Sequence, residues 1–323
     1  MRILVTGAEG FVGGHLLRAL ATDGQHEVVA GYWSGAAPAT QGPAAALTQV
    51  PIDVTSSSSL EAVIDRHRPE WVIHLAAQSS VSRSFADPVG TWEVNATGTL
   101  RLAEALRAKR TGPVRLLVIS SAEVYGEVPP EAQPIGERAP LRPSTPYGAS
   151  KAAAELAALQ VAEDDGVEVV IARSFNHAGP GQDERFVFPS MARQLMRIRR
   201  GDAGSDPVLR VGNLEVYRDF LDVRDVVRAY LLLMRRGENR VTYNVCSGVS
   251  RSLLEMVTRL VELSGSGARL EVDPERFRPV DIPVLYGDAS RLRALGWAPE
   301  IELEQTLRDL LAEAELTTTA EVG

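Results

Sequence analysis

Two short stretches carry the side chains best suited to chemistry. "SSAEVYG" places Ser120, Ser121 and Glu123 at the end of an apolar run, and "PYGASK" spaces Tyr147 and Lys151 four residues apart. Four residues are about one helical turn, so both side chains lie on one face, where the ammonium is expected to lower the phenol's pKa from about 10. A serine and such a tyrosine can hold an oxygen atom and exchange a proton with it. We therefore predict proton transfer at a carbinol or carbonyl oxygen by Ser121, Tyr147 and Lys151, with Ser120 as the alternative serine.

A glycine-rich loop precedes these stretches at the start of the chain. "TGAEGFVGG" follows the first apolar run and opens a helical pattern, in the form T-G-x-x-G-x-x-G. Glycines allow a tight turn and let a pyrophosphate reach the amides of a helix N-terminus, where the helix dipole favours negative charge. The glycines could also form an ordinary tight turn, but their position between a strand and a helix favours a dinucleotide-binding loop. The motif predicts a dinucleotide cofactor bound by Gly7, Gly10, Phe11, Val12 and Gly13.

The sequence leaves the choice between NAD(H) and NADP(H) open. The acid that usually binds the ribose is missing, because the second apolar run ends "AGYWSG", and nothing there would repel a 2′-phosphate. The arginine that usually binds that phosphate is also missing, since no Lys or Arg occurs between Arg18 and Arg66. Asp53, in "IDVT", could accept a hydrogen bond from adenine or could cap a turn or helix.

The elements that must position these residues follow an alternating pattern. Short apolar runs suit strands buried on both faces of a parallel sheet, and the segments between them have apolar residues at helical spacing. This predicts an α/β fold with a doubly wound parallel sheet (Rossmann) and a smaller, discontinuous C-terminal α/β domain for the substrate. We expect the NAD(P)-binding domain at 1–174, with 219–248 returning to it, and the substrate domain at 175–323. The predicted strands are 2–6, 26–32, 71–76, 115–120 and 167–173, and the predicted helices are 11–24, 58–69, 98–110 and 150–166.

Composition excludes several other classes of protein. The 323 residues have a formal net charge of −8, which argues against a surface for nucleic acid or anionic membranes. Cys246 is the only cysteine, so no intrachain disulfide can form, and no segment is long and apolar enough to span a bilayer. The chain opens on "MRILVTG" without a leader pattern, so we expect a cytoplasmic protein. We predict no metal site.

Together these motifs resemble a known family, the extended short-chain dehydrogenase/reductases, also called the NAD-dependent epimerase/dehydratase family. The resemblance covers nearly the whole chain through "TGAEGFVGG", "HLAAQ", "NATGT", "SSAEVYG", "TPYGASK", "RSFNHAGPGQ", "RDFLDVRDVVRAY" and "YNVCSG". "FNHAGPGQ", "VGNLEVYRDF" and "RFRPVDIPVLYGD" look most like enzymes of GDP-6-deoxy-hexoses, and "FNHAGPGQ" is closest to the GDP-6-deoxy-D-mannose reductases.

The resemblance implies further binding residues. Tyr147 and Lys151 would contact the cofactor as well as the substrate, and Arg218 and Arg278 would neutralise the diphosphate or hold the nucleoside, which suits guanidinium groups. Without the resemblance, both arginines would be taken for surface ion-pair partners, and serines after a strand for caps. The other implied cofactor residues are Val54, Leu75, Ala76, Ala77 and Asn95, and the other implied substrate residues are Ser79, Ser80, Glu123, Asn176, Arg193 and Asn213.

Ala122 bears on the reaction type. Dehydratases of this family remove a C5 proton with a glutamate, here Glu123, and need a neighbouring acid or hydroxyl for the leaving group, where this chain has alanine. Alanine can neither donate a proton nor polarise an oxygen. The resemblance therefore implies NAD(P)H-dependent reduction of the C4 ketone of GDP-4-dehydro-6-deoxy-D-mannose to GDP-D-rhamnose, in deoxysugar biosynthesis. GDP-mannose 4,6-dehydratase, then nucleotide-sugar 4-epimerase, and a noncatalytic dinucleotide-binding sensor are the alternatives.

The resemblance also implies a homodimer. Family members usually dimerise through helices that include the one bearing Tyr147 and Lys151, and the following "AAAELAALQV" is apolar enough for such a helical interface. Packing against the protein's own core would explain the same pattern. The sequence leaves both explanations open.

Overall fold

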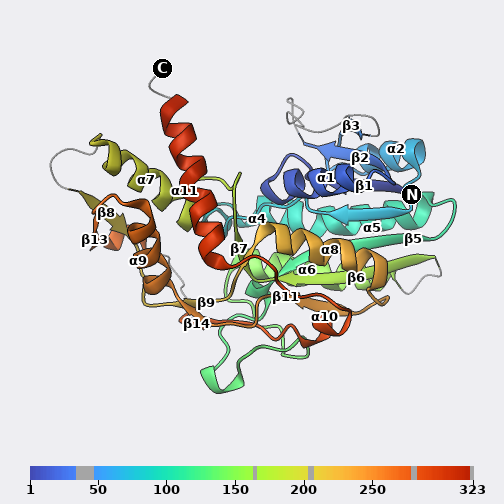
Figure 1. Ribbon diagram of the computed structural model, residues 1–323. Coiled ribbons are helices and arrows are strands. Elements are labelled where there is room, and N and C mark those ends of the chain that lie inside the picture. The colour runs from blue at the N-terminus through green and yellow to red at the C-terminus, as the bar shows by residue number, and fades with distance from the viewer. Residues whose placement is uncertain (34–46, 163–165, 203–206, 278–281, 321–323) are drawn as a thin grey trace.

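A seven-stranded sheet forms the centre of the molecule (Figure 1). A computed structural model describes residues 1–33, 47–162, 166–202, 207–277 and 282–320. For residues 318–320 it describes the backbone only. Every neighbouring pair of strands is parallel, in the order β11-β6-β5-β4-β1-β2-β3. The predicted doubly wound α/β fold is confirmed. The strands are β1 (Arg2–Thr6), β2 (Glu27–Tyr32), β3 (Leu47–Pro51), β4 (Trp71–His74), β5 (Val114–Ser121), β6 (Val167–Ser174) and β11 (Thr242–Val245).

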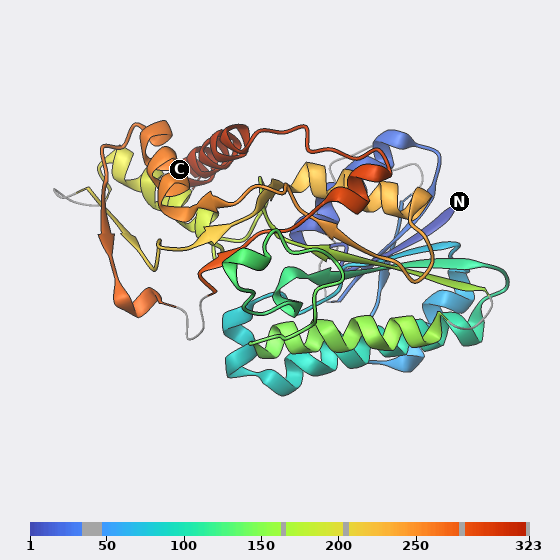
Figure 2. The same ribbon diagram turned by 90° about the horizontal axis from the view of Figure 1, so that it is seen from below.

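Helices cover both faces of this sheet (Figure 2). Successive strand side chains point to opposite faces, so Leu4 and Val5 of β1 belong to two different hydrophobic clusters. This explains why the strands are apolar throughout. One face is covered by α2 (Ser57–His67), α5 (Gly98–Lys109) and α6 (Pro146–Val161), and the other by α1 (Phe11–Asp23), α8 (Val223–Arg236) and α10 (Ser290–Ala294).

Helix α6 begins at Pro146, so Tyr147 and Lys151 lie on one helix, as their spacing predicted. Thr145 caps it by accepting a hydrogen bond from the amide of Gly148 at 3.0 Å, and Pro146 occupies the first helical position, where its missing N–H is no loss. The apolar spacing marks this helix only from Ser150, whereas the Tyr147–Lys151 spacing already required it to begin before that residue. The earlier start brings Tyr147 into the first turn of the helix.

The remaining chain forms a second core beside the carboxyl ends of the strands (Figure 1). It contains α7 (Val187–Arg200), α9 (Leu253–Ser264) and α11 (Leu303–Ala320), with β8 (Val208–Val211) paired to β13 (Arg269–Val272). The predicted division at residue 174, with 219–248 returning, stays a prediction. The connecting elements are α3 (Val81–Ala86), α4 (Pro88–Trp92), η1 (Glu93–Thr97), η2 (Ala122–Val124), η3 (Pro130–Ala132), β7 (Asn176–Ala178), β9 (Tyr217–Arg218), β10 (Phe220–Asp222), β12 (Arg251–Ser252), η4 (Pro274–Arg276) and β14 (Val284–Leu285).

Two structural features are absent from the described residues. None of their helices combines the length and the apolar character needed to cross a bilayer. In the same part of the chain, no group of three or more His, Cys, Asp or Glu side chains is arranged to hold a metal ion.

Candidate active site

The candidate site lies where the sheet order reverses, between β1 and β4, at the carboxyl ends of the strands. Gly7 follows β1 with a φ of 69°, in the left-handed region that glycine tolerates. A Cβ atom on Gly7 would lie 2.6 Å from the backbone nitrogen of Ala76, in the loop after β4. The two loops therefore touch backbone to backbone. This brings the predicted cofactor residues of both loops together.

The N-terminus of α1 fits the pyrophosphate of a dinucleotide. Gly10 caps the helix without a side-chain hydrogen bond, and the first turn contains no acid that would compete for its amides. A Cβ atom on Gly13 would lie 2.6 Å from the carbonyl oxygen of Gly7, so only glycine permits this tight turn. Phe11 stacks on His177, with 6.0 Å between ring centroids, and so joins the loop to β7.

Asp53 forms a turn rather than standing free. Its Oδ1 accepts hydrogen bonds from the backbone N–H of Thr55 at 2.8 Å and from the Thr55 hydroxyl at 2.7 Å. Of the two predicted roles of Asp53, these bonds correspond to capping a turn. A hydrogen bond from Asp53 to adenine stays a prediction. Val54 is buried, with its side chain 3.1 Å from where a Cβ on Gly98 would lie.

Asn95 is buried in the π-helical turn η1 and links two parts of the site. Its Oδ1 accepts from the amide of Gln78 at 2.8 Å, and its Nδ2 donates to the carbonyl of Gln78 and to the hydroxyl of Ser150, both at 3.0 Å. Gln78 follows the loop after β4, and Ser150 lies on α6 beside Lys151. Asn95 therefore fixes the helix with the catalytic candidates to a loop with cofactor candidates.

The structure brings Ser121, Glu123 and Tyr147 together. Ser121 is the last residue of β5. Its hydroxyl forms a hydrogen bond with the Tyr147 phenol and accepts a hydrogen bond from the amide of Glu123 at 3.2 Å. A Cβ atom on Gly148 would lie 2.6 Å from the carbonyl oxygen of Glu123, so this glycine lets α6 approach η2 closely. Lys151 lies one helical turn after Tyr147 and is buried.

Burial controls the proton affinities at this site. It raises the pKa of Tyr147 to about 12, opposed by the hydrogen bond with Ser121 and reinforced by the charge of Glu123. The phenol's pKa is therefore raised overall, because burial outweighs the hydrogen bond with Ser121, and the predicted effect of the Lys151 charge on it stays a prediction. Burial also lowers the pKa of Lys151 to about 8, while the carboxylate of Glu155 opposes that change. At neutral pH Tyr147 is a protonated phenol and Lys151 is largely charged.

A buried ion pair between Glu155 and Arg173 lies one helical turn from Lys151. Glu155, one turn further along α6, accepts from Nη2 of Arg173 at 2.7 Å and from Nε at 2.9 Å. The hydroxyl of Ser120 also donates to Glu155. Ser120 is thus buried and hydrogen-bonded to this pair, which disfavours it as the alternative serine, and the role of Ser121 stays a prediction.

Ala122 is part of the hydrophobic core. Only 3% of its surface is exposed, and it belongs to the cluster that contains Tyr125 and Phe175. An ionised acid at this position would lose its hydration, which costs free energy unless it is paired. The neighbouring Glu123 is half-buried.

The predicted substrate residues near β4 and on β7 differ in accessibility. Ser79 and Asn176 are exposed. Ser80 caps α3 by accepting from the amide of Arg83 at 3.2 Å, which is the capping alternative. Substrate contacts of all three residues stay predictions.

The remaining substrate candidates lie in and beside the second core. Arg193 forms an ion pair with Glu184 at 2.8 Å, and Asn213 accepts from the amide of Glu215 at 2.9 Å. Arg218 is buried, whereas the sequence alone would place it on the surface, and it donates to the carbonyl of Tyr217 at 2.9 Å. Their roles stay predictions, and Arg278 lies outside the described residues.

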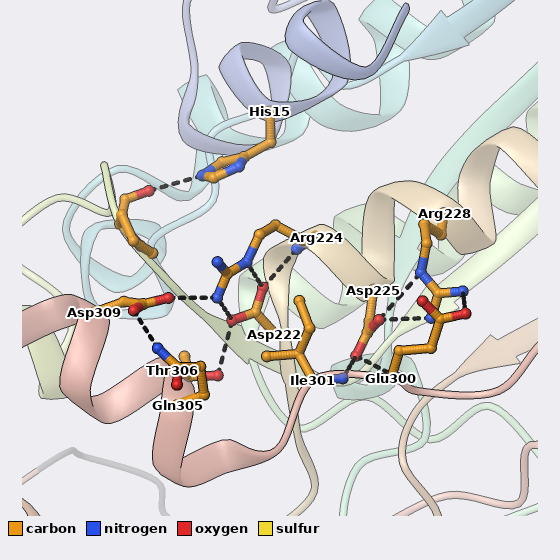
Figure 3. Close-up of polar contacts among 11 residues, drawn as sticks. His15, Asp222, Arg224, Asp225, Arg228, Glu300, Ile301, Gln305, Thr306 and Asp309 are labelled. Atoms are coloured by element: carbon orange, nitrogen blue, oxygen red, sulfur yellow. Dashed lines mark hydrogen bonds and ion pairs between the residues drawn. The ribbon is translucent and has the colours of Figure 1, made fainter. Parts of the chain in front are cut away.

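Polar contacts join the turn between β10 and α8 to the C-terminal helix α11 (Figure 3). Arg224 bridges Asp222 at 2.8 Å and Asp309 of α11 at 2.6 Å, and the hydroxyl of Thr306 donates to Asp222 at 2.8 Å. On the facing side, a ring nitrogen of His15 on α1 lies 2.8 Å from the carbonyl oxygen of Pro180. These contacts hold α1, α8 and α11 around the loop after β7.

Sequence reasoning missed three residues with clear contacts at the site. The backbone of Gln78 is bound by the side chain of Asn95, and Glu155 forms the ion pair with Arg173. Glu155 could have been found from its four-residue spacing to Lys151. Glu9 accepts a hydrogen bond from the amide of Trp33 at 3.0 Å. Nothing local in the glycine motif marks this contact, because its partner lies 24 positions away.

The sequence is similar to those of curated proteins over most of its length. The chain is 39% identical to the GDP-6-deoxy-D-mannose reductase of Pseudomonas aeruginosa, over 97% of each chain. It is 34% identical to GDP-mannose 4,6 dehydratase 2 of Arabidopsis thaliana, over 81% of this chain and 70% of that protein.

Solved structures and a family model extend the comparison. RMD from P. aeruginosa complexed with NADPH has a TM-score of 0.82 at 38% identity, covering 98% of this chain and 99% of that one. DesIV, a dTDP-glucose 4,6-dehydratase from Streptomyces venezuelae with NAD and TYD bound, has a TM-score of 0.84 at 26% identity, covering 99% and 98%. The family model described as GDP-mannose 4,6 dehydratase matches residues 4–310. The resemblance to extended short-chain dehydrogenase/reductases is confirmed, and the chain belongs to the GDP-mannose 4,6-dehydratase family.

Proposed function

We propose that this protein is an NAD(P)H-dependent oxidoreductase that reduces the C4 ketone of GDP-4-dehydro-6-deoxy-D-mannose to GDP-D-rhamnose. The observation that carries this proposal is the Ser121–Tyr147 pair, in which the phenol is hydrogen-bonded and protonated. Reduction of a ketone consumes one hydride and one proton, and a protonated phenol can supply the proton. The 39% identity to a GDP-6-deoxy-D-mannose reductase supports the choice of substrate.

The chain's own residues divide the proton chemistry. Ser121 and Tyr147 would donate hydrogen bonds to the ketone oxygen, and Tyr147 would transfer its proton as the oxygen becomes a hydroxyl. The charge of Lys151 would stabilise the phenolate that remains. Glu123 is free of any need to abstract a proton in this reaction and would orient a sugar hydroxyl.

The cofactor would supply the hydride, and the residues at the ends of β1 and β4 fit it. Gly7, Gly10 and Gly13 permit the close backbone packing of the loop that opens α1, whose N-terminus would bind the pyrophosphate. Solved relatives bind NADPH and NAD, which supports a dinucleotide here. The other residues that we propose to hold it are Phe11, Val12, Asp53, Val54, Leu75, Ala76, Ala77 and Asn95, with Tyr147 and Lys151 from α6.

Ala122 favours reduction over dehydration. An elimination needs a group beside Glu123 that protonates or polarises the departing hydroxyl, and the methyl group of Ala122 is buried among apolar side chains instead. A reductase has no leaving group and needs nothing at this position.

The substrate is proposed to lie between the site and the second core. Asn176 on β7 and Arg218 on β9 would meet its diphosphate, because an amide and a guanidinium both donate hydrogen bonds to phosphate oxygens. The further residues that we propose on this side are Ser79, Ser80, Arg193, Asn213 and Arg278. A nucleotide-sugar substrate and a dinucleotide cofactor favour the cytoplasm as the place of reaction.

Two incubations test the proposed reaction. Purified protein with GDP-4-dehydro-6-deoxymannose and NADPH or NADH should yield a product that has gained two hydrogen atoms, measured by mass spectrometry. The same protein with GDP-mannose and no reductant should leave its substrate unchanged. Loss of water from GDP-mannose would instead identify a dehydratase with Glu123 as its base. Tight cofactor binding without turnover in either incubation would favour a sensor.

A homodimer is proposed on the face that carries α3 to α6. Five large apolar side chains are exposed there although their helices pack together, and Leu156 of α6 is 65% exposed. Exposed apolar side chains on one face are typical of an interaction surface. The five are Phe85, Val89, Trp92, Leu100 and Leu156.

A further inference from the structure

The structure places a carboxylate where the sequence showed none. Glu9 precedes the second glycine of the loop, and its Oε1 accepts a hydrogen bond from the amide of Trp33, directly after β2, at 3.0 Å. The amide of Ala8 donates to the carbonyl oxygen of Gly31 at 3.0 Å. Two hydrogen bonds thus join the phosphate loop to the end of β2, and the Glu9 carboxylate lies at this junction.

This junction is the part of a dinucleotide fold that meets the adenosine ribose. In such folds a carboxylate at the end of the second strand accepts a hydrogen bond from the ribose 2′-hydroxyl, whereas an arginine there binds the 2′-phosphate of NADP. The strand itself ends in Gly31, Tyr32 and Trp33, which carry no charge. Glu9 therefore supplies from the loop the group that the strand lacks.

The carboxylate is available to a ligand and is not neutralised. Glu9 is exposed, and its Oε2 makes no hydrogen bond within the described parts of the chain. No Lys or Arg occurs between Arg18 and Arg66. Arg18 extends back along α1 toward Gly14 and affects the titration of His15, on another part of that helix.

We propose that Glu9 makes this protein select NADH over NADPH. The inference deepens the proposed reductase function and rests on it. The Oε2 atom accepts from the ribose hydroxyl of NADH, and the same charge repels the 2′-phosphate of NADPH. NADPH bound to a relative at 38% identity does not determine the preference of this chain.

The expected selectivity for NADH over NADPH follows from the exposed position of the Glu9 carboxylate. Two like charges in contact repel each other more strongly beside a protein than in bulk water, so a selectivity of about tenfold is expected. A phosphate monoester carries nearly two charges at neutral pH, which acts in the same direction. Salt should reduce the selectivity, because exposed charges are screened.

Direct binding measurements test the proposal. Dissociation constants for NADH and NADPH are measured by titration calorimetry on the wild type, Glu9→Gln and Glu27→Gln. Glutamine keeps an oxygen that can accept from Trp33, so Glu9→Gln removes the charge and retains the junction. Glu27 lies at the opposite end of the same strand and is also exposed, so it controls for the change in net charge.

The wild type should bind NADH about tenfold more tightly than NADPH, and Glu9→Gln should largely abolish this ratio while Glu27→Gln leaves it unchanged. A wild type without NADH preference, or an unchanged ratio in Glu9→Gln, would overturn the role of Glu9. Turnover separates this inference from the reductase proposal. Selective NADH binding without reduction of the keto sugar would refute only the reductase, whereas reduction with a preference for NADPH would refute only Glu9. A protein that binds neither dinucleotide would refute both.

Discussion

At the scale of single residues, the phenol of Tyr147 is the group on which the proposed chemistry depends most. Tyr147→Phe removes the proton donor and the bond to Ser121 but keeps the ring, so turnover should fall by about 10²–10⁴-fold while dinucleotide binding persists. Steady-state kinetics and calorimetry check the two parts. Tyr217→Phe, which removes an exposed phenol hydroxyl on β9, should retain activity. Normal turnover in Tyr147→Phe would remove Tyr147 from its role.

The titration of Lys151 predicts how kcat/KM for reduction depends on pH. A lysine is charged below its pKa, which burial lowers to about 8 here, so kcat/KM for reduction should decline as the pH rises through about 8. Tyr147, with a pKa raised to about 12, stays protonated over this range. The measurement is kcat/KM between pH 6 and 10.

Glu155 offers a check on the identity of the titrating group. Its carboxylate raises the pKa of Lys151, so Glu155→Gln should move the decline to lower pH. A profile that is level to pH 10 in the wild type, or that does not move in the variant, would assign the decline to a group other than Lys151.

At the scale of elements, Asn95 connects η1 with the loop after β4 and with α6. Asn95→Ala removes three hydrogen bonds of a buried side chain and should lower the free energy of unfolding by about 2–4 kcal/mol, with a loss of kcat because α6 is less firmly placed. Ser150→Ala removes only one of these three and should cost less. Urea unfolding and kinetics measure both effects, and equal losses in the two variants would contradict the linking role of Asn95.

At the scale of the whole molecule, the exposed apolar side chains of α3 to α6 predict the assembly. Leu156→Glu places a charge in the proposed dimer interface, where burying it is unfavourable, and should convert the dimer to a monomer. Leu316→Glu, on the exposed side of α11, makes the same change away from this face and should leave the dimer intact. Size-exclusion chromatography with light scattering gives the mass. A wild-type monomer, or dissociation by both variants, would refute the interface.

Much of the fold was predictable because local physics determines it. The strands β1, β5 and β6 are apolar on both faces, and the glycine loop and the Tyr147–Lys151 spacing lie within single elements, so the sequence contains the whole signal. The apolar pattern of α6 begins only at Ser150, because Thr145 and the first turn carry little apolar signal, so the first turn was indicated by the Tyr147–Lys151 spacing alone.

The tertiary structure alone decided which polar groups meet. The phenol's pKa depends on burial by the whole fold, the pairing of Ser120 with Glu155 joins β5 to α6, and Glu9 reaches a strand end 24 positions away. Spacing along a chain determines which face of one element a side chain occupies, and it is silent on contacts between elements. The sequence by itself thus determined the sheet, the loop and the catalytic spacing, whereas protonation and the charge beside the proposed ribose site required the packed structure, because both depend on distances through space.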